Sequence, residues 1–178
     1  MSDVNHRVFI SYHHDDQEEV DNFLTTFCDE RNVFTYRAVG SMSDDIINSD
    51  DPEYVMSQIR QKYLTDSTVT IVLIGKCTRA RRYVDWEIKT SLRQGTYTPN
   101  GLIGILLPSM GKTATAPPRL AANILGKNAD EGYARWYTYP TRKDTLRNLI
   151  EDAFQARKSR ANLIVNSAEM FKNNRSCD

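Results

Sequence analysis

Apolar residues along this chain fall into short continuous runs, separated by stretches of helical periodicity. The run Thr68–Gly75 reads Thr-Val-Thr-Ile-Val-Leu-Ile-Gly and is rich in β-branched residues. This pattern is typical of a strand that is buried on both faces of a parallel sheet. Similar runs predict four further strands, at Arg7–Tyr12, Val33–Val39, Gly101–Leu107 and Ala134–Tyr139.

Between the runs, apolar residues repeat every three or four positions, which predicts helices. Val84, Ile88 and Leu92 place one helix between about Arg79 and a stop at Gly95. Comparable patterns predict helices after Asp15–Asp16, after the Asp51-Pro52 start, and from Thr141 to about Lys158. We expect a loop at Gly40–Asp51 and a helical turn at Leu120–Leu125.

Strand and helix alternate about five times with short connections. This order predicts an α/β fold: a flavodoxin-like, doubly wound sheet of about five mainly parallel strands with helices on both faces. We place the domain at residues 1–158 and treat 159–178 as a C-terminal helical extension or tail. Within that tail we expect a weakly amphipathic helix at Ala161–Phe171 and a frayed end at Lys172–Asp178.

Composition narrows the function classes. Lys and Arg together number 23, as do Asp and Glu, so net charge does not favour nucleic acid or a membrane surface as partner. No secretory signal is evident, and no apolar run approaches the roughly 18 residues of a membrane span. Cys28, Cys77 and Cys177 are widely spaced and form no Cys-x-x-Cys pair. We therefore expect a cytoplasmic, reducing environment without a disulfide framework or zinc site.

Glu87 is the most informative polar residue in the predicted helices. At roughly 100° per residue it lies about 60° to the side of the apolar stripe, next to Tyr83 one turn earlier. A carboxylate at the rim of a core, near the carboxyl end of a strand, is where open α/β sheets bind ligands. The alternative is that Glu87 is a flanking charge paired with a neighbouring Arg or Lys. We assign the solvent face of this helix to Asp85, Lys89 and Arg93, and Glu87 does not lie on it.

Other motifs are less specific. Gly111-Lys112-Thr113 lacks the earlier glycine that a phosphate loop needs, because Leu106 stands there. His13-His14 follows the first strand and is either a ligand-facing or a solvated loop, and we predict no metal site. The basic cluster Arg79–Arg82 opposes the dipole of the following helix, so we expect an acidic partner, either a ligand phosphate or carboxylates such as Asp85.

Two segments resemble a known family. The opening Val-Phe-Ile-Ser-Tyr with its acidic helix start is similar to the opening of Toll/interleukin-1 receptor (TIR) domains. Ser67–Gly75 followed by Arg81–Ile88, which reads Arg-Arg-Tyr-Val-Asp-Trp-Glu-Ile, more specifically resembles the TIR-like proteins of bacterial Thoeris anti-phage systems. In that family an aromatic residue precedes the catalytic glutamate by one helical turn, and Tyr83 and Glu87 match that spacing.

The resemblance implies an enzyme that consumes NAD⁺ as substrate and needs no bound cofactor. It implies that the ADP-ribosyl group becomes a cyclic or conjugated signal that activates a partner effector, and it leaves the product open. Glu87 would be catalytic, and the residues on the nucleotide side would be Phe9, Ser11, Tyr12, His13 and Tyr83.

Two other classes stay open. One is a non-enzymatic TIR-like module that assembles with itself or with a partner; it would bind equally well after Glu87→Gln. The other is a flavodoxin-like receiver or nucleotide-binding domain. The chain shows neither the acidic phosphoacceptor cluster nor the phosphate loop that those two functions use.

Overall fold

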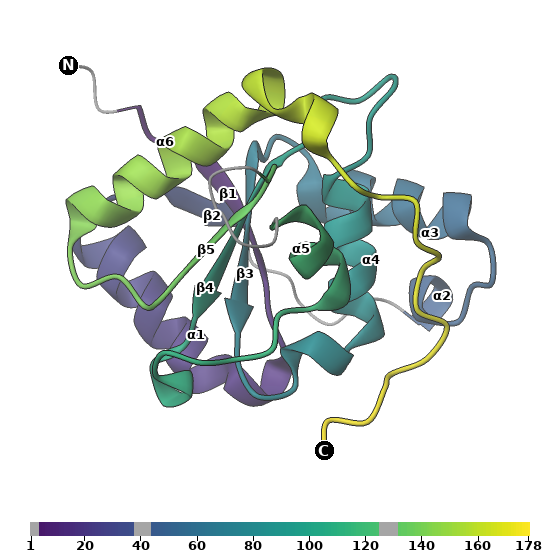
Figure 1. Ribbon diagram of the computed structural model, residues 1–178, viewed down its shortest axis with the longest axis horizontal. Coiled ribbons are helices and arrows are strands. Elements are labelled where there is room, and N and C mark those ends of the chain that lie inside the picture. The colour runs from purple at the N-terminus through teal and green to yellow at the C-terminus, as the bar shows by residue number, and fades with distance from the viewer. Residues whose placement is uncertain (1–3, 38–43, 125–131) are drawn as a thin grey trace.

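The computed structural model describes residues 4–37, 44–124 and 132–178. Five parallel strands form one sheet, and helices lie against both of its faces (Figure 1). The strands are β1 (Arg7–Ser11), β2 (Thr35–Arg37), β3 (Val69–Ile74), β4 (Gly101–Leu106) and β5 (Arg135–Tyr137). The helices are α1 (Gln17–Leu24), α2 (Asp44–Ile47), α3 (Pro52–Ile59), α4 (Arg82–Ser91), α5 (Pro118–Asn123) and α6 (Lys143–Ser159).

The strand order is β2-β1-β3-β4-β5, which confirms the predicted flavodoxin-like, doubly wound fold. Every residue of β3 and β4 is buried, as expected for strands that are covered on both faces. Strand β2 lies at one edge, and its three residues are exposed. We predicted this strand at Val33–Val39. The described strand is Thr35–Arg37, and residues 38 and 39 lie outside the described part of the chain.

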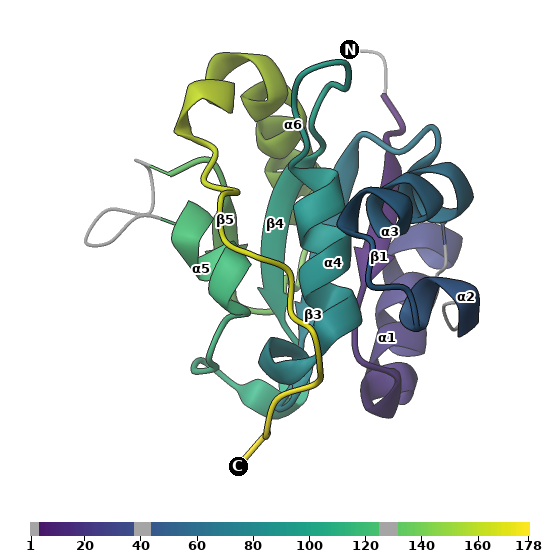
Figure 2. The same cartoon turned by 90° about the vertical axis from the view of Figure 1, so that its right-hand side faces the viewer.

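Two hydrophobic layers enclose the sheet. Helices α1 and α6 pack on one face, where Phe23 and Ile150 meet inward residues of β1, β3 and β4. Helices α2 to α5 cover the other face, where Val84 and Ile88 of α4 meet β3, and Ile46 of α2 joins Phe9 of β1. Figure 2 shows α4 over the sheet between α3 and α5.

Local signals fixed several helix boundaries. The carboxylate of Asp51 accepts hydrogen bonds from the backbone N–H groups of Glu53 and Tyr54, and Pro52 begins α3 as predicted. Helix α4 ends at Ser91, four residues before the predicted stop at Gly95. Residues 40–43 of the expected loop lie outside the described part of the chain, whereas residues 44–47 form the short helix α2.

The C-terminal tail differs most from the prediction. After a short 3₁₀ turn at Ala161–Leu163, it runs in an extended conformation across the outer side of α4 (Figure 2). The predicted helix at Ala161–Phe171 is wrong. The predicted frayed end is also wrong, because the tail bonds first to α4 and then, up to Cys177, to the turn that precedes α4. An extended segment of mixed polarity has no period, so its docking was not visible in the sequence.

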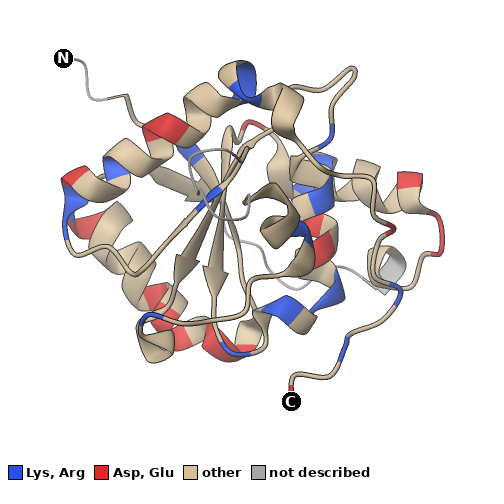
Figure 3. Ribbon diagram, viewed as in Figure 1, with Lys and Arg blue, Asp and Glu red and all other residues tan. Residues whose placement is uncertain are grey.

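Charges of both signs are interspersed along the helices in Figure 3. No helix among the described residues is long and apolar enough to cross a membrane.

Candidate functional site

The candidate site lies where the direction of the sheet connections reverses, between β1 and β3. In this strand order, ligands bind outside the carboxyl ends of the strands at that point. A 3₁₀ turn follows each of the two strands, at His14–Asp16 and at Thr78–Ala80. The two turns meet near Gly75, where an added Cβ would lie 2.2 Å from the Asp16 carboxylate, so a larger residue would force the Asp16 side chain to move.

Glu87 of α4 lies beside Ser11, the last residue of β1, and is fully enclosed. Only 2% of its surface is exposed; the sequence had placed it at the rim of the core instead. Burial raises the pKa of its carboxyl group to about 8, and the neighbouring Ser11 hydroxyl opposes part of that shift. The two side chains are close enough for the Ser11 hydroxyl to lower the pKa of Glu87, but neither Glu87 Oε2 nor Ser11 Oγ forms a hydrogen bond of good geometry with any described residue. Two buried polar atoms without hydrogen bonds lower the stability of the folded protein. A bound ligand could supply their missing hydrogen-bond partners.

Tyr83 lies one helical turn before Glu87 and connects it to the loop after β1. The Tyr83 hydroxyl is 2.8 Å from His13 Nδ1 and 3.3 Å from His14 Nδ1. Burial, followed by the charge of Glu87, raises the pKa of Tyr83 to about 12. The Tyr83 phenol therefore stays protonated. It connects the loop His13-His14 with α4, the helix that carries Glu87.

His13 and Tyr12 complete the loop side of the site. His13 is buried, and desolvation lowers its pKa, which favours the neutral imidazole. Tyr12 is half-buried and donates a hydrogen bond to Gln17 Oε1 at 2.8 Å. Burial raises the Tyr12 pKa, and Glu87 contributes to this rise, so the two side chains interact electrostatically.

The predicted site residues thus divide into two groups. Ser11, Tyr12 and Tyr83 each interact with Glu87, whereas His13 contacts Tyr83. Phe9 lies two residues before Ser11 on the same face of the sheet, but it is fully buried in the core against α2, α3 and Trp86. Phe9 is part of the hydrophobic core beneath the end of β1, and none of its surface is exposed to a ligand.

The structure also reveals a buried ion pair that the sequence did not suggest. Arg119 Nε donates to Asp85 Oδ1 at 2.9 Å, and both side chains are almost completely buried. Asp85 also accepts from the backbone N–H of Phe171, and Arg119 donates to the Glu169 carbonyl. The assignment of Asp85 to a solvent face is wrong because the tail covers this side of α4.

The tail supplies hydrogen-bond partners for the basic cluster Arg79–Arg82. Arg79, Arg81 and Arg82 donate to the backbone carbonyls of Cys177, Arg175 and Lys172, respectively. We expected a ligand phosphate or carboxylates as partners of these arginines. The structure instead shows that all three guanidinium groups bind peptide carbonyls of the tail.

A disulfide closes the tail onto the site loop. Cys77, two residues after Gly75, is bonded to Cys177 across a sequence separation of 100. The expectation of a chain without a disulfide framework is therefore wrong, because Cys77 and Cys177 pair while Cys28 stays free. Spacing along the chain does not report proximity, and the docked tail brings Cys177 to the turn that follows β3.

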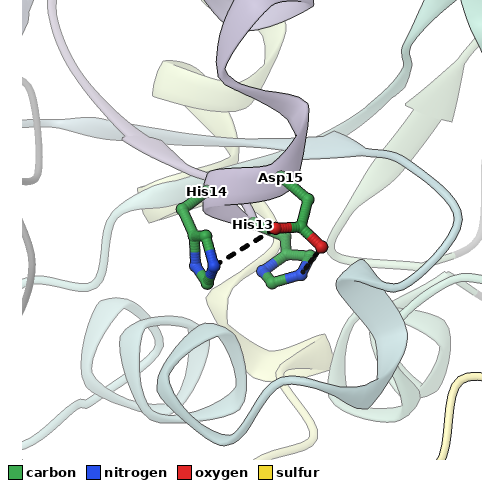
Figure 4. Close-up of side chains that lie close together, drawn as sticks. All are labelled: His13, His14 and Asp15. Carbon is green, nitrogen blue, oxygen red and sulfur yellow. Dashed lines mark ion pairs between the residues drawn. The ribbon is translucent and has the colours of Figure 1, made fainter.

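A cavity of about 910 Å³ lies on another side of α4, between the residues around Asp50 and the tail. Arg82, Trp86 and Lys89 of α4 line it together with Phe171, but Glu87 does not. Because the fully enclosed Glu87 carboxylate, which has an unpaired oxygen, lies outside this cavity, we place the candidate site at Glu87. The residues that could hold a metal ion lie beside it, at His13, His14 and Asp15 (Figure 4).

The all-parallel sheet with the order β2-β1-β3-β4-β5, and a glutamate helix beside its switch point, define a TIR-like α/β domain. Residues 9–112 match the family described as Thoeris protein ThsB, TIR-like domain, and the chain belongs to this family. It is thus a TIR module of an anti-phage defence family. No curated protein matches the chain.

Proposed function

We propose that this domain cleaves the bond between nicotinamide and ribose in NAD⁺ and converts the ADP-ribosyl group into a signal for a partner effector. The observation that carries the proposal is the enclosed carboxylate of Glu87, with an unpaired Oε2 at the switch point of a TIR-like sheet. Structural carboxylates in a core are paired. An unpaired carboxylate suits a ligand that supplies the missing hydrogen-bond donors.

The chemistry requires an anion in a dry site. As the glycosidic bond breaks, the electron pair leaves with nicotinamide and positive charge develops on the ribose. A fixed carboxylate stabilises this charge most at the transition state, where the charge is greatest. Ribose hydroxyls would donate to Glu87, and the unpaired Ser11 hydroxyl lies where it can bind the same sugar. Water, another part of the substrate or a second acceptor then captures the ribosyl carbon.

The protonation state of Glu87 links substrate binding to activity. With a pKa raised to about 8 by burial, the carboxyl group is largely neutral at pH 7 before substrate binds. The cationic nicotinamide ring of NAD⁺ favours the ionised form, because opposite charges attract strongly in a site of low dielectric constant. Since Glu87 is 2% exposed, the groups that cover it must move before NAD⁺ can reach it. The described conformation is therefore a resting one.

The test compares small molecules in phage-infected cells that express the wild type, Glu87→Gln or Glu30→Gln. Infected cells are used because a resting enzyme need not turn over NAD⁺ without its trigger. Glu30 is exposed and lies after α1, so Glu30→Gln makes the same chemical change away from the candidate site. We expect mass spectrometry to find a nucleotide product with wild type and Glu30→Gln and none with Glu87→Gln. Identical metabolites from all three strains, with phage resistance retained, would instead favour the assembly module.

A further inference from the structure

His13, His14 and Asp15 bring three metal-ligating side chains together where β1 ends. In Figure 4 the Asp15 carboxylate forms an ion pair with each of the two imidazole rings, one through each oxygen. His13 Nε2 lies 3.1 Å from Asp15 Oδ2, and His14 Nε2 lies 3.2 Å from Asp15 Oδ1. One ligand atom from each residue lies within 4.8 Å of the others. The Nδ1 atoms of both rings approach the Tyr83 hydroxyl.

Protons alone do not satisfy these four contacts when both rings are neutral. The Asp15 carboxylate only accepts, so each Nε2 must carry the ring's single proton. Both Nδ1 atoms are then acceptors, yet the Tyr83 hydroxyl has one proton and can donate to one of them. Without an ion, all four contacts are satisfied only if at least one ring is an imidazolium. His13 is 3% exposed, so charging it is costly; His14 is 75% exposed and lies beside Asp15, so an imidazolium at His14 is the ion-free alternative that the metal titration tests.

We propose that His13, His14 and Asp15 bind a divalent transition-metal ion of the Zn²⁺ type through the two Nε2 atoms and the Asp15 carboxylate. The ion takes the place of both Nε2 protons. Each ring then carries its proton on Nδ1 and donates it to one of the two lone pairs of the Tyr83 oxygen. Every contact in the cluster then becomes favourable, and neither ring has to be an imidazolium.

The distances fit such an ion. With metal–ligand bonds of about 2.0–2.2 Å, neighbouring ligand atoms of a tetrahedral site lie roughly 3.4 Å apart. The two observed nitrogen–oxygen distances are close to this value. The side chains of His14 and Asp15 are 75% and 70% exposed, so both can adjust around the ion, and the ion can enter from solvent. Two imidazoles favour Zn²⁺, Ni²⁺ or Cu²⁺ over Mg²⁺ or Ca²⁺.

The ion would act on the candidate site through Tyr83. A hydrogen-bond partner of a ligating histidine fixes the tautomer and orientation of the ring, and here that partner is the side chain next to Glu87 on α4. Tyr83 is therefore a positioning residue of the metal cluster. This inference does not depend on NAD⁺ cleavage, because ion binding is measured without substrate.

The first test is a titration of the untagged, oxidised protein with Zn²⁺ against a chromophoric chelator, repeated with Co²⁺ and its visible absorption. We expect one equivalent to bind, and His14→Ala and Asp15→Asn each to weaken binding at least tenfold. Both side chains are exposed, so the variants should fold, and their melting curves check this. The free thiol of Cys28 competes poorly, because burial raises its pKa to about 12.

His6→Gln is the matched control, since His6 lies outside the cluster and pairs with Glu151. It should bind the ion as the wild type does. Wild-type protein that binds no equivalent would overturn the proposal, as would ligand variants that bind with unchanged affinity.

A second test reads the ring nitrogens directly. Long-range ¹H–¹⁵N spectra should show Zn²⁺ on Nε2 and a proton on Nδ1 for both His13 and His14. Metal on either Nδ1 would contradict the arrangement. Tyr83→Phe should weaken Zn²⁺ binding about 10–100-fold if Tyr83 accepts from both rings, and unchanged affinity would remove Tyr83 from the cluster.

Discussion

Replacing Glu87 by Gln should stabilise the folded protein at neutral and alkaline pH. Burial holds the pKa of Glu87 at about 8 in the folded state, against an ordinary value of 4.5. Between these two values the unfolded chain has released a proton that the folded chain retains. The free energy of unfolding of the wild type therefore falls as the pH rises from about 4.5 to 8. Gln has no such proton, so Glu87→Gln removes this dependence.

The size of the effect follows from the two pKa values. Each pKa unit corresponds to about 1.4 kcal/mol, so the burial cost of the ionised form is about 1 kcal/mol at pH 5 and about 4 kcal/mol at pH 8. The variant should thus gain roughly 3 kcal/mol on the wild type between these pH values. This difference does not depend on how well the Gln amide packs, because packing contributes equally at both pH values.

Urea denaturation at pH 5 and pH 8, under conditions that keep the disulfide closed, measures this difference. Glu30→Gln is the control, and as an exposed substitution it should change stability by less than about 0.5 kcal/mol at both pH values. An equal pH dependence in wild type and Glu87→Gln, or a variant that loses stability on going from pH 5 to pH 8, would refute the reasoning. The enclosed carboxylate would then be solvated or paired in solution.

Two further predictions concern the tail. Opening Cys77–Cys177, with reductant or by Cys177→Ser, should lower the free energy of unfolding by up to about 4–5 kcal/mol, since the bond closes a loop of about 100 residues. Thermal melts with and without reductant test this prediction. An equal loss of stability in the Cys28→Ser protein would contradict it. Asp85→Ala should cost about 3–5 kcal/mol, because Arg119 would remain buried without its partner. In urea denaturation, the double variant Asp85→Ala/Arg119→Leu should recover part of this loss, and no recovery would argue against the ion pair.

Residues with a clear period were predicted best. The uninterrupted apolar runs of β3 and β4 identified the centre of the sheet, and alternation with helical segments predicted its parallel, doubly wound order. Glu87 was noticed because it departs from the apolar stripe of α4, and the family match includes it. The angle of a side chain on a helix says which neighbours it faces, but it does not say how deeply later segments enclose it.

Contacts between distant, aperiodic segments were not predictable in the same way. The sequence suggested a frayed end at Lys172–Asp178 and three separate cysteines, whereas the tail bonds to α4 and closes with the disulfide at Cys177. Arg119 follows two prolines and gives no local signal of its ion pair with Asp85. Such contacts depend on backbone carbonyls and single side chains brought together across the fold.

The sequence by itself determined the layers of this protein, because apolar periodicity specifies which face of each strand and helix is buried. It also placed Glu87 and the His13-His14 loop each near the end of a predicted strand, and the family resemblance assigned Glu87 and His13 to one site. Only the tertiary structure decided that Glu87 is fully enclosed with an unpaired oxygen and that Tyr83 links it to the two histidines. Burial and hydrogen bonding of polar groups depend on what packs above them, and that information is distributed over segments far apart in the chain.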